Sequence, residues 1–267
     1  MENLKNDLTD LTIDESVHTK AFCDDKKDLL IEVRNLKKIY SVGSEKVRAL
    51  DGIDLDIKKN EILVILGTSG SGKSTFLNML AGLEKPTKGS VKILGKNISK
   101  MSETGLAKFR QKNIGFIFQS YNLLPNLTSI ENIELPLIFK KVNSKERRKE
   151  AEKLIDAVGL TSHKDHKPTQ LSGGQQQRIG IARAFVGTPA VIFADEPTGN
   201  LDTKTTAKVL KLMISMCKKR KQTLIIVTHD PSIASHGDRI VKIIDGKIRK
   251  IEINDIDYSN IDEKIEF

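Results

Sequence analysis

The sequence contains no tryptophan, and aromatic residues make up only 4% of it. Proteins that bind single-stranded nucleic acids usually stack the bases on aromatic side chains, so this scarcity argues against that class of protein. Long apolar runs are also missing. The longest run near the middle of the chain covers residues 62–66, whereas a membrane-spanning helix needs about 20 apolar residues. The first residues are polar and acidic, so we expect no secretory signal.

Cysteine is scarce as well. The two cysteines, Cys23 and Cys217, are far apart, and neither belongs to a metal-ligand spacing. Isolated cysteines of this kind are typical of intracellular proteins, so we expect two reduced thiols in the cytosol.

Charge is plentiful but unevenly spread along the chain. The net charge is +9, yet residues 1–28 carry eight acidic residues against four lysines, and residues 250–267 carry six against two. The intervening residues 29–249 therefore carry a net charge of +17. A body this basic is compatible with nucleic acid, an anionic membrane surface, phosphate ligands or simply a solvated lysine-rich surface, so charge alone leaves the function open.

Apolar periodicity predicts strands that alternate with helices. Strands are expected at residues 29–33, 53–57, 62–66, 90–94, 114–118, 190–194 and 223–228. Helices are expected at about residues 73–83, 145–158 and 203–219, with another after Ser172. Asp245 and Gly246 stand between two alternating runs, which predicts a hairpin. This order predicts an α/β fold with a largely parallel sheet and helices on its faces.

The strongest motif is a glycine-rich loop between a predicted strand and a predicted helix. It fits the pattern GxxxxGK[ST], and the strand–loop–helix setting is what makes that pattern meaningful. Its glycines let backbone N–H groups curl around a phosphate, and the helix adds the partial positive charge of its N-terminus. Lys73 can reach the β- and γ-phosphates, and the Ser74 hydroxyl can ligate Mg²⁺. The predicted phosphate site consists of Gly67, Thr68, Ser69, Gly70, Ser71, Gly72, Lys73, Ser74 and Thr75.

Two acidic residues, Asp195 and Glu196, follow the apolar run at residues 191–194. A buried parallel strand that ends in Asp places the carboxylate at the edge of the sheet where nucleotides bind. Asp195 is therefore the candidate for holding Mg²⁺. Glu196 points elsewhere by strand alternation and is the candidate general base for an attacking water.

A second glycine-rich helix start lies far along the chain from the first. Ser172, Gly173, Gly174 and Gln175 follow Leu171 and precede a predicted helix, which makes a second anion site. The alternative is an ordinary serine cap. If one chain cannot fold both anion sites onto one nucleotide, a two-fold dimer can bring them together between subunits.

This order of motifs resembles that of the ABC ATPases over about residues 29–249. Besides the phosphate loop, the resemblance rests on Gln119, LSGGQ at residues 171–175, the Asp195–Glu196 pair, NLD at residues 200–202, and His229. It implies a P-loop ABC ATPase core with a mostly parallel sheet, an antiparallel β subdomain and a helical subdomain at about residues 120–180. Residues 1–28 and 250–267 lie outside it as an acidic extension and an acidic tail.

The resemblance also implies a role for each motif. Tyr40 would stack on the adenine of ATP. Gln119 would touch Mg²⁺ or the attacking water and sense a membrane partner, and His229 would contact the γ-phosphate and that water. The implied catalytic residues are Glu196, His229 and Gln119, and the implied Mg²⁺ residues are Ser74, Gln119 and Asp195.

The remaining implied residues belong to a subunit interface. Ser172 and Gly174, together with Gly173 and Gln175, would bind the γ-phosphate of a nucleotide held by the opposite subunit. Asp202 would line the seam between the subunits. The resemblance thus implies a homodimer that clamps two ATP molecules head to tail.

The implied function is the ATP-hydrolysing subunit of an ABC transport system, with ATP and Mg²⁺ as cofactors. Its partner would be an integral membrane permease, which implies a peripheral position on the cytoplasmic face of the cell membrane and no direct contact with nucleic acid. Residues 118–125, 131–137 and 195–202 resemble the branch that serves macrolide export, lipoprotein release, antimicrobial-peptide resistance and cell-division signalling. A groove between the core and residues 120–160 would accept a cytoplasmic helix of the permease.

Three alternatives stay open at this point. The first is a soluble ABC ATPase that acts on ribosomes or DNA, although only one ATPase cassette is present and residues 76–170 leave no room for a long coiled coil. The second is a phosphate-loop kinase or GTPase, but the sequence has no NKxD guanine motif and neither class explains LSGGQ. The third is a binding module without hydrolysis, against which Glu196 and His229 speak.

Overall fold

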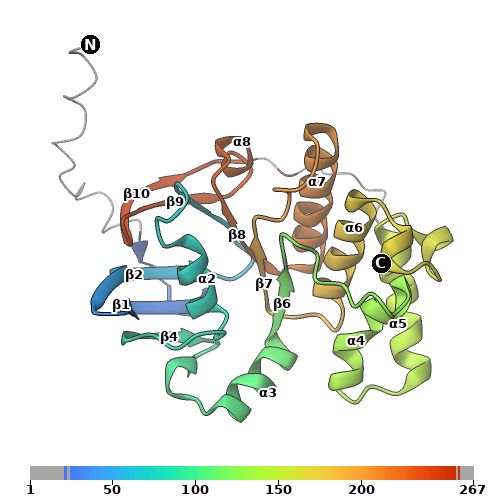
Figure 1. Ribbon diagram of the computed structural model, residues 1–267, viewed down its shortest axis with the longest axis horizontal. Coiled ribbons are helices and arrows are strands. Elements are labelled where there is room, and N and C mark those ends of the chain that lie inside the picture. The colour runs from blue at the N-terminus through green and yellow to red at the C-terminus, as the bar shows by residue number, and fades with distance from the viewer. Residues whose placement is uncertain (1–20, 23–24, 257, 259–267) are drawn as a thin grey trace.

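Two β-sheets stand side by side in the computed structural model of the protein, which describes residues 21–22, 25–256 and 258 (Figure 1). The smaller sheet is antiparallel and has the strand order β2-β1-β4-β5. Its strands are β1 (Leu29–Val42), β2 (Glu45–Lys58), β4 (Lys88–Ile93) and β5 (Lys96–Asn97).

The larger sheet has the order β10-β9-β3-β8-β7-β6. All its neighbouring strands are parallel except β10 and β9, which form an antiparallel hairpin. Its strands are β3 (Ile62–Leu66), β6 (Ile114–Ile117), β7 (Val191–Asp195), β8 (Thr223–Thr228), β9 (Arg239–Ile244) and β10 (Lys247–Ile253). The predicted mostly parallel sheet and separate antiparallel subdomain are therefore confirmed.

Helices cover both faces of the larger sheet. They are α2 (Lys73–Leu80), α3 (Glu103–Asn113), α4 (Ser129–Phe139), α5 (Ser144–Ala157), α6 (Gly173–Phe185), α7 (Thr203–Arg220) and α8 (Pro231–Ala234). Short 3₁₀ turns occur at Ile98–Lys100, Thr161–His163 and Pro168–Gln170. Among the described residues, none of these helices is both long enough and apolar enough to cross a membrane.

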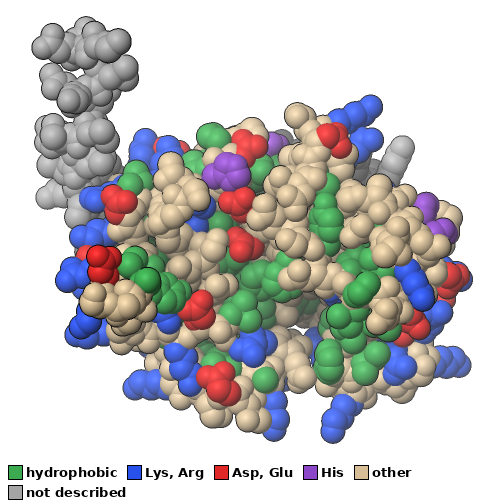
Figure 2. All heavy atoms as spheres, viewed as in Figure 1, with side chains coloured by type: hydrophobic (Ala, Val, Ile, Leu, Met, Phe, Trp, Pro, Cys, Tyr) green, Lys and Arg blue, Asp and Glu red, His purple; other side chains and the backbone are tan. Residues whose placement is uncertain are grey.

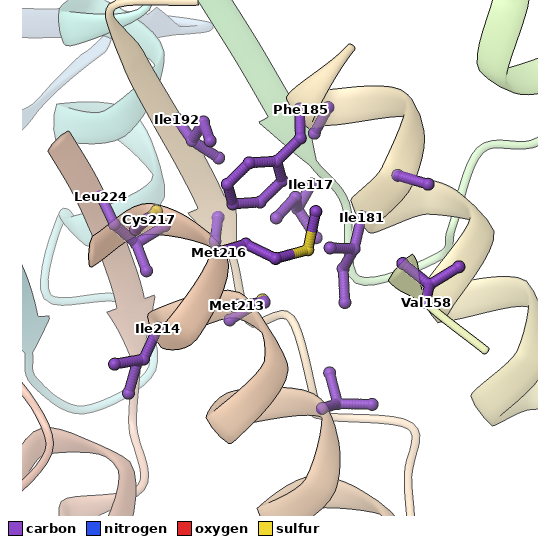
Figure 3. Packing of buried hydrophobic residues seen from close by; sticks show 14 of the residues in the cluster. Ile117, Val158, Ile181, Phe185, Ile192, Met213, Ile214, Met216, Cys217 and Leu224 are labelled. Carbon is purple, nitrogen blue, oxygen red and sulfur yellow. The ribbon is translucent and has the colours of Figure 1, made fainter. Parts of the chain in front are cut away.

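Alternation along the parallel strands divides the interior into two cores. Leu63 and Ile65 of β3 face α2 and the antiparallel sheet, whereas Ile62 and Val64 face the helices on the other side. The second core contains Phe185 of α6 among residues of β7, β8 and α7 (Figure 3). Fully buried strands on both faces are what a parallel sheet requires, because each face packs against another layer.

The backbone confirms the predicted hairpin, in which the Asp245–Gly246 turn joins β9 to β10. Two other turns contain residues in the left-handed conformation: Asn60, with φ 61°, lies in the turn before β3, and Gly159, with φ 67°, follows α5.

Other elements were predicted too short or were not predicted at all. Strands predicted at 29–33 and 53–57 belong to one long hairpin, because β1 and β2 pair from Leu29 opposite Lys58 to Val42 opposite Glu45. Helix α3 was not predicted: it buries only Leu106 and Phe109 and has a weak apolar stripe. Helix α4 was not predicted as a separate element either, since Pro136 lies inside it and apolar residues occupy most of its surface.

The predicted boundaries at the two ends of the chain do not coincide with breaks in the fold. Within the predicted acidic extension, Ala21 is buried, and the Phe22 ring packs on the core with the Arg34 guanidinium 4.9 Å from its centroid. The predicted tail begins at residue 250, yet β10 continues to Ile253. Residues 1–20, 23–24, 257 and 259–267, which include most of the predicted extension and Cys23, lie outside the described residues.

Candidate active site

The glycine-rich loop between β3 and α2 is pressed against neighbouring backbone. A Cβ atom at Gly67 would collide with the carbonyl oxygen of Ile243, and one at Gly72 would collide with that of Ala49. Gly72 has φ 100°, which favours glycine over any residue with a side chain. Glycine is therefore required at both positions for the loop to pack against its neighbours in this shape, and a glycine-rich loop before a helix is the arrangement that cradles a phosphate.

The hairpin at the far edge of the sheet supports this loop. The amide of Gly246 donates to the carbonyl oxygen of Ser71 at 3.0 Å, and the amide of Asp51 donates to Gly246 at 3.0 Å. The predicted Asp245–Gly246 turn therefore holds the glycine-rich loop in place between the two sheets.

Lys73 and Ser74 begin α2 and point toward the end of β7. The Ser74 hydroxyl donates to Oδ1 of Asp195 at 3.2 Å, and Nζ of Lys73 donates to the carbonyl oxygen of Thr68 at 2.6 Å. Burial lowers the pKa of Lys73, against the pull of Glu196 and Asp195. Burial also raises the pKa of Asp195, against its hydrogen bond from Ser74. Two predicted Mg²⁺ residues therefore lie in direct contact.

Glu196 and His229 follow the adjacent strands β7 and β8. Glu196 has φ 43°, a left-handed conformation rare for a residue with a side chain, and its amide donates to the carbonyl oxygen of Val227 at 3.0 Å. Its Oε1 lies 3.0 Å from Nδ1 of His229. Backbone strain of this kind is retained where the surrounding structure enforces it, often at functional sites.

A cavity of about 600 Å³ opens beside the phosphate loop. It is lined by the loop residues Gly67, Thr68 and Ser69 and by both Glu196 and His229. The predicted base, its histidine neighbour and the first three residues of the phosphate loop thus line one hollow.

Gln119 lies just beyond β6, next to the segment that follows β7. Its carbonyl oxygen accepts a hydrogen bond from Nδ2 of Asn200 at 3.0 Å. Its side-chain amide lies so close to Gly199 that a Cβ there would be 2.9 Å from Nε2. Asn200 was not among the predicted site residues, because its link to Gln119 appears only when β6 and β7 pair.

Tyr40 lies on β1, in the antiparallel sheet, and its ring reaches α2. Its hydroxyl donates to Oε2 of Glu84 at 2.8 Å, and Thr75 lies near enough to lower its pKa slightly. Burial and the Glu84 contact raise the pKa of Tyr40. The predicted adenine-stacking residue is therefore next to the last residue of the phosphate loop.

The second glycine-rich segment forms a different hollow. Ser172 caps α6: its hydroxyl accepts from the amide of Gln175 at 3.3 Å, and Oε1 of Gln175 accepts from the amide of Ser172 at 2.8 Å. A Cβ at Gly174 would lie 2.8 Å from a methyl of Thr205 on α7, so this glycine is also required for packing. Ser172 thus acts as a helix cap, as the alternative interpretation predicts. Capping of this kind does not exclude an exposed N-terminus of α6.

This second hollow has a volume of about 420 Å³ and is separate from the first. It is lined by the four predicted residues Ser172, Gly173, Gly174 and Gln175, and by the Asn200–Asp202 segment. Asp202 caps α7 by accepting from the amide of Thr205 at 3.0 Å. Within the described part of the chain, no residue lines both hollows, so the fold does not bring the two anion sites together.

The sequence is similar to many proteins of known family. A family model described as ABC transporter matches residues 50–199. An uncharacterized ABC transporter ATP-binding protein of Thermotoga maritima is 48% identical over 231 residues, which cover 86% of this chain and 98% of that protein. The ATP-binding protein MJ0796 of Methanocaldococcus jannaschii is 44% identical over 227 residues, which cover 84% of this chain and 97% of that protein.

Solved structures agree with the fold described above. A dimeric structure of MJ0796 in a post-hydrolysis state, bound to ADP and Pi, has a TM-score of 0.79 at 42% identity and covers 84% of this chain and 98% of its own. Another dimeric structure of MJ0796 has the same TM-score at 43% identity, with the same coverage. The chain is accordingly an ATPase, and it belongs to the ABC transporter family of ATP-binding proteins.

Proposed function

We propose that this ATPase works as a homodimer that holds two ATP molecules head to tail and drives an integral membrane permease. The observation that carries the proposal is the separation of the two anion sites into hollows that share no described residue. In a two-fold dimer, both subunits contribute the same surfaces to the interface. The phosphate loop of one subunit can therefore face the second hollow of its partner. The dimers of MJ0796 support this arrangement.

The phosphate loop and the end of β7, beside the first hollow, would bind the triphosphate and Mg²⁺. The hydroxyl of Ser71 is buried without a hydrogen-bond partner among the described residues, which fits a loop shaped around an anion. The hydroxyl of Ser74 and the carboxylate of Asp195 form the oxygen-donor set that Mg²⁺ prefers. Lys73 would neutralise charge on the β- and γ-phosphates, and bound Mg²⁺ would stabilise the charge that develops during phosphoryl transfer.

Glu196 would polarise the attacking water as general base. Its turn away from β7 and its contact with His229 hold the carboxylate beside the phosphate loop. His229 would orient that carboxylate and touch the γ-phosphate. Gln119 would complete the site from β6, close to both the water and the Mg²⁺.

The second hollow would act on the nucleotide of the partner subunit. Ser172 and Gly174 would present the N-terminus of α6 to the γ-phosphate, with Gly173 and Gln175 beside them. Asp202 would line the seam. Because ATP would be part of the interface, nucleotide would favour the closed dimer, and loss of the γ-phosphate would release it.

A groove of about 240 Å³ between α3, β6 and α4 would receive a helix of the permease. It is lined mainly by apolar side chains, including Phe116, Phe118 and Leu135, and Phe139 at its edge is 58% exposed. Figure 2 shows hydrophobic side chains gathered on this face, with lysine and arginine side chains around the lower edge. An apolar groove that accepts an amphipathic helix is a common mode of protein recognition.

Such a partner would place the ATPase at the cytoplasmic face of the membrane as a peripheral subunit. The branch that serves macrolide export, lipoprotein release and related tasks remains our proposal for the subfamily. In that branch, the permease would convert closing and opening of the dimer into mechanical work.

The shared site can be tested by complementation. Lys73→Ala disables the phosphate loop of one chain, and Ser172→Arg blocks the second hollow of the other chain. Each variant alone should be inactive, whereas a mixture forms heterodimers with one intact composite site and should recover roughly a quarter of wild-type turnover. A mixture as inactive as its components would refute the composite site.

A further inference from the structure

The segment of β1 that carries Tyr40 is hydrogen-bonded to the loop that follows α2. The amide of Ile39 donates to Oγ1 of Thr87 at 3.0 Å, and the amide of Thr87 donates to the carbonyl oxygen of Lys37 at 2.9 Å. Nζ of Lys38 donates to the carbonyl oxygen of Lys85 at 3.0 Å. These hydrogen bonds therefore fix this part of β1 relative to α2, the helix that begins at the phosphate loop.

Glu84 is the junction of these contacts. Its Oε2 accepts from the Tyr40 hydroxyl at 2.8 Å and lies 3.2 Å from Nζ of Lys38. Nδ2 of Asn78, on α2, lies 3.5 Å from Oε1 of the same carboxylate. One side chain thus links the antiparallel sheet to the phosphate helix.

The network also fixes the Tyr40 ring. Its hydroxyl is held by Glu84, and the Lys38 ammonium lies 5.0 Å from the ring centroid. Burial acts to raise the pKa of Glu84, but the hydrogen bonds from Tyr40 and Lys38 outweigh it and lower the pKa. The carboxylate is therefore charged near neutral pH, and hydrogen bonds to a charged acceptor are stronger than those to a neutral one.

An aromatic platform gives more affinity if it is already in place when the base arrives. A free Tyr40 side chain would lose rotamer freedom on stacking, and that loss would be subtracted from the binding free energy. A ring already held by Glu84 avoids this loss. The separation between the ring and the phosphate loop is fixed at the same time, because the Glu84 carboxylate also contacts Asn78 of α2, the helix that begins at the phosphate loop.

We propose that Glu84 is a positioning residue for ATP: it holds Tyr40 at a fixed distance from the phosphate loop so that adenine and triphosphate bind together. The inference rests on the proposed stacking of adenine on Tyr40. The expected effect is confined to the part of the ATP binding free energy that comes from adenine. It can therefore be measured separately from phosphate binding.

The test compares two ligands, ATP and inorganic tripolyphosphate, by equilibrium titration of the full-length protein. Glu84→Ala should weaken ATP binding by about tenfold and leave tripolyphosphate binding unchanged. Glu84→Gln keeps a hydrogen-bond acceptor and should retain most of the affinity for ATP. The control is Glu103→Ala, because Glu103 is a nearby exposed carboxylate that pairs with Lys85 at 3.0 Å.

Steady-state kinetics and a second variant make the result decisive. Glu84→Ala should raise KM for ATP with little change in kcat, since the reacting atoms are untouched. Tyr40→Phe keeps the ring but loses the hydroxyl, and should show a smaller loss of the same kind. Equal weakening of both ligands, or unchanged ATP affinity in Glu84→Ala, would overturn the proposal. If the wild-type protein bound ATP no more tightly than tripolyphosphate, the stacking role of Tyr40 itself would fail.

Discussion

Nδ1 of His229 lies 3.0 Å from Oε1 of Glu196. The two residues follow neighbouring parallel strands, and their side chains meet beside the phosphate loop. A carboxylate that is to act as general base needs a fixed orientation, and this contact supplies one.

Replacing His229 by Ala should therefore reduce turnover much more than ATP binding. The loss of an orienting partner for the proposed base, and of the proposed contact to the γ-phosphate, should lower kcat by about 10²- to 10⁴-fold. His236→Ala is the control, because His236 is an exposed histidine on the same segment and contacts the backbone of Ser232. Steady-state ATPase assays and equilibrium titration measure the two quantities, and a fully active His229→Ala enzyme would refute the assigned role.

Ser172→Arg should abolish turnover while each monomer still binds ATP. Arginine would fill the second hollow, which lies away from the phosphate loop of its own chain. The matched control is Ser144→Arg at the exposed start of α5. Loss of ATP affinity in monomeric Ser172→Arg would mean that the second hollow serves its own nucleotide instead.

Phe139→Asp should release the protein from the membrane fraction of cells that contain its permease. The side chain is 58% exposed at the edge of the groove, so a charge there should disfavour an apolar helix without unfolding the protein. Ile253→Asp is the control, since Ile253 is 64% exposed on β10, at the opposite edge of the sheet from β6. Fractionation followed by immunoblotting measures the change. Equal release of both variants, or of neither, would argue against the groove as the docking site.

A buried ion pair gives a prediction for stability. Nε of Arg239 lies 2.7 Å from Oε1 of Glu61, with the two side chains only 7% and 8% exposed. Arg239→Met would leave the Glu61 carboxylate buried without its charge partner, and should cost about 3–5 kcal/mol in the free energy of unfolding. Urea denaturation measures this free energy.

The same variant should show a pH dependence of defined sign. Burial already raises the pKa of Glu61, and loss of Arg239 would raise it further. A carboxyl group with a folded-state pKa above its unfolded value contributes stability at low pH and loses it as pH rises through the folded pKa. The destabilisation should therefore be smaller near pH 5 than near pH 7.5. A constant penalty across this range would show that Glu61 stays ionised in the variant.

Much of the site was predictable because its parts are continuous in sequence. The phosphate loop, the acidic end of β7 and the cap of α6 are each set by a few neighbouring residues, and local hydrogen bonds such as Ser172 to Gln175 fix their shape. The order of strands and helices followed from apolar runs that are buried on both faces of a parallel sheet.

The remainder depends on contacts between distant segments. Glu84 looks like an ordinary surface acid in the sequence, and only the packing of β1 against the end of α2 brings it to Tyr40. The long β1–β2 hairpin was cut short in the prediction because its outer half, near Val42 and Val47, is exposed and has no apolar alternation. Tertiary pairing, rather than local preference, makes these residues strands.

The most direct test of the head-to-tail dimer is the molar mass of Glu196→Gln in solution, measured by light scattering with and without ATP. The substitution removes the proposed base but keeps the proposed nucleotide contacts, so ATP should bind and persist. We expect a monomer without nucleotide and a dimer with ATP, and a monomer in both conditions for the double variant Glu196→Gln with Ser172→Arg. A Glu196→Gln protein that stayed monomeric with saturating ATP would contradict the shared site.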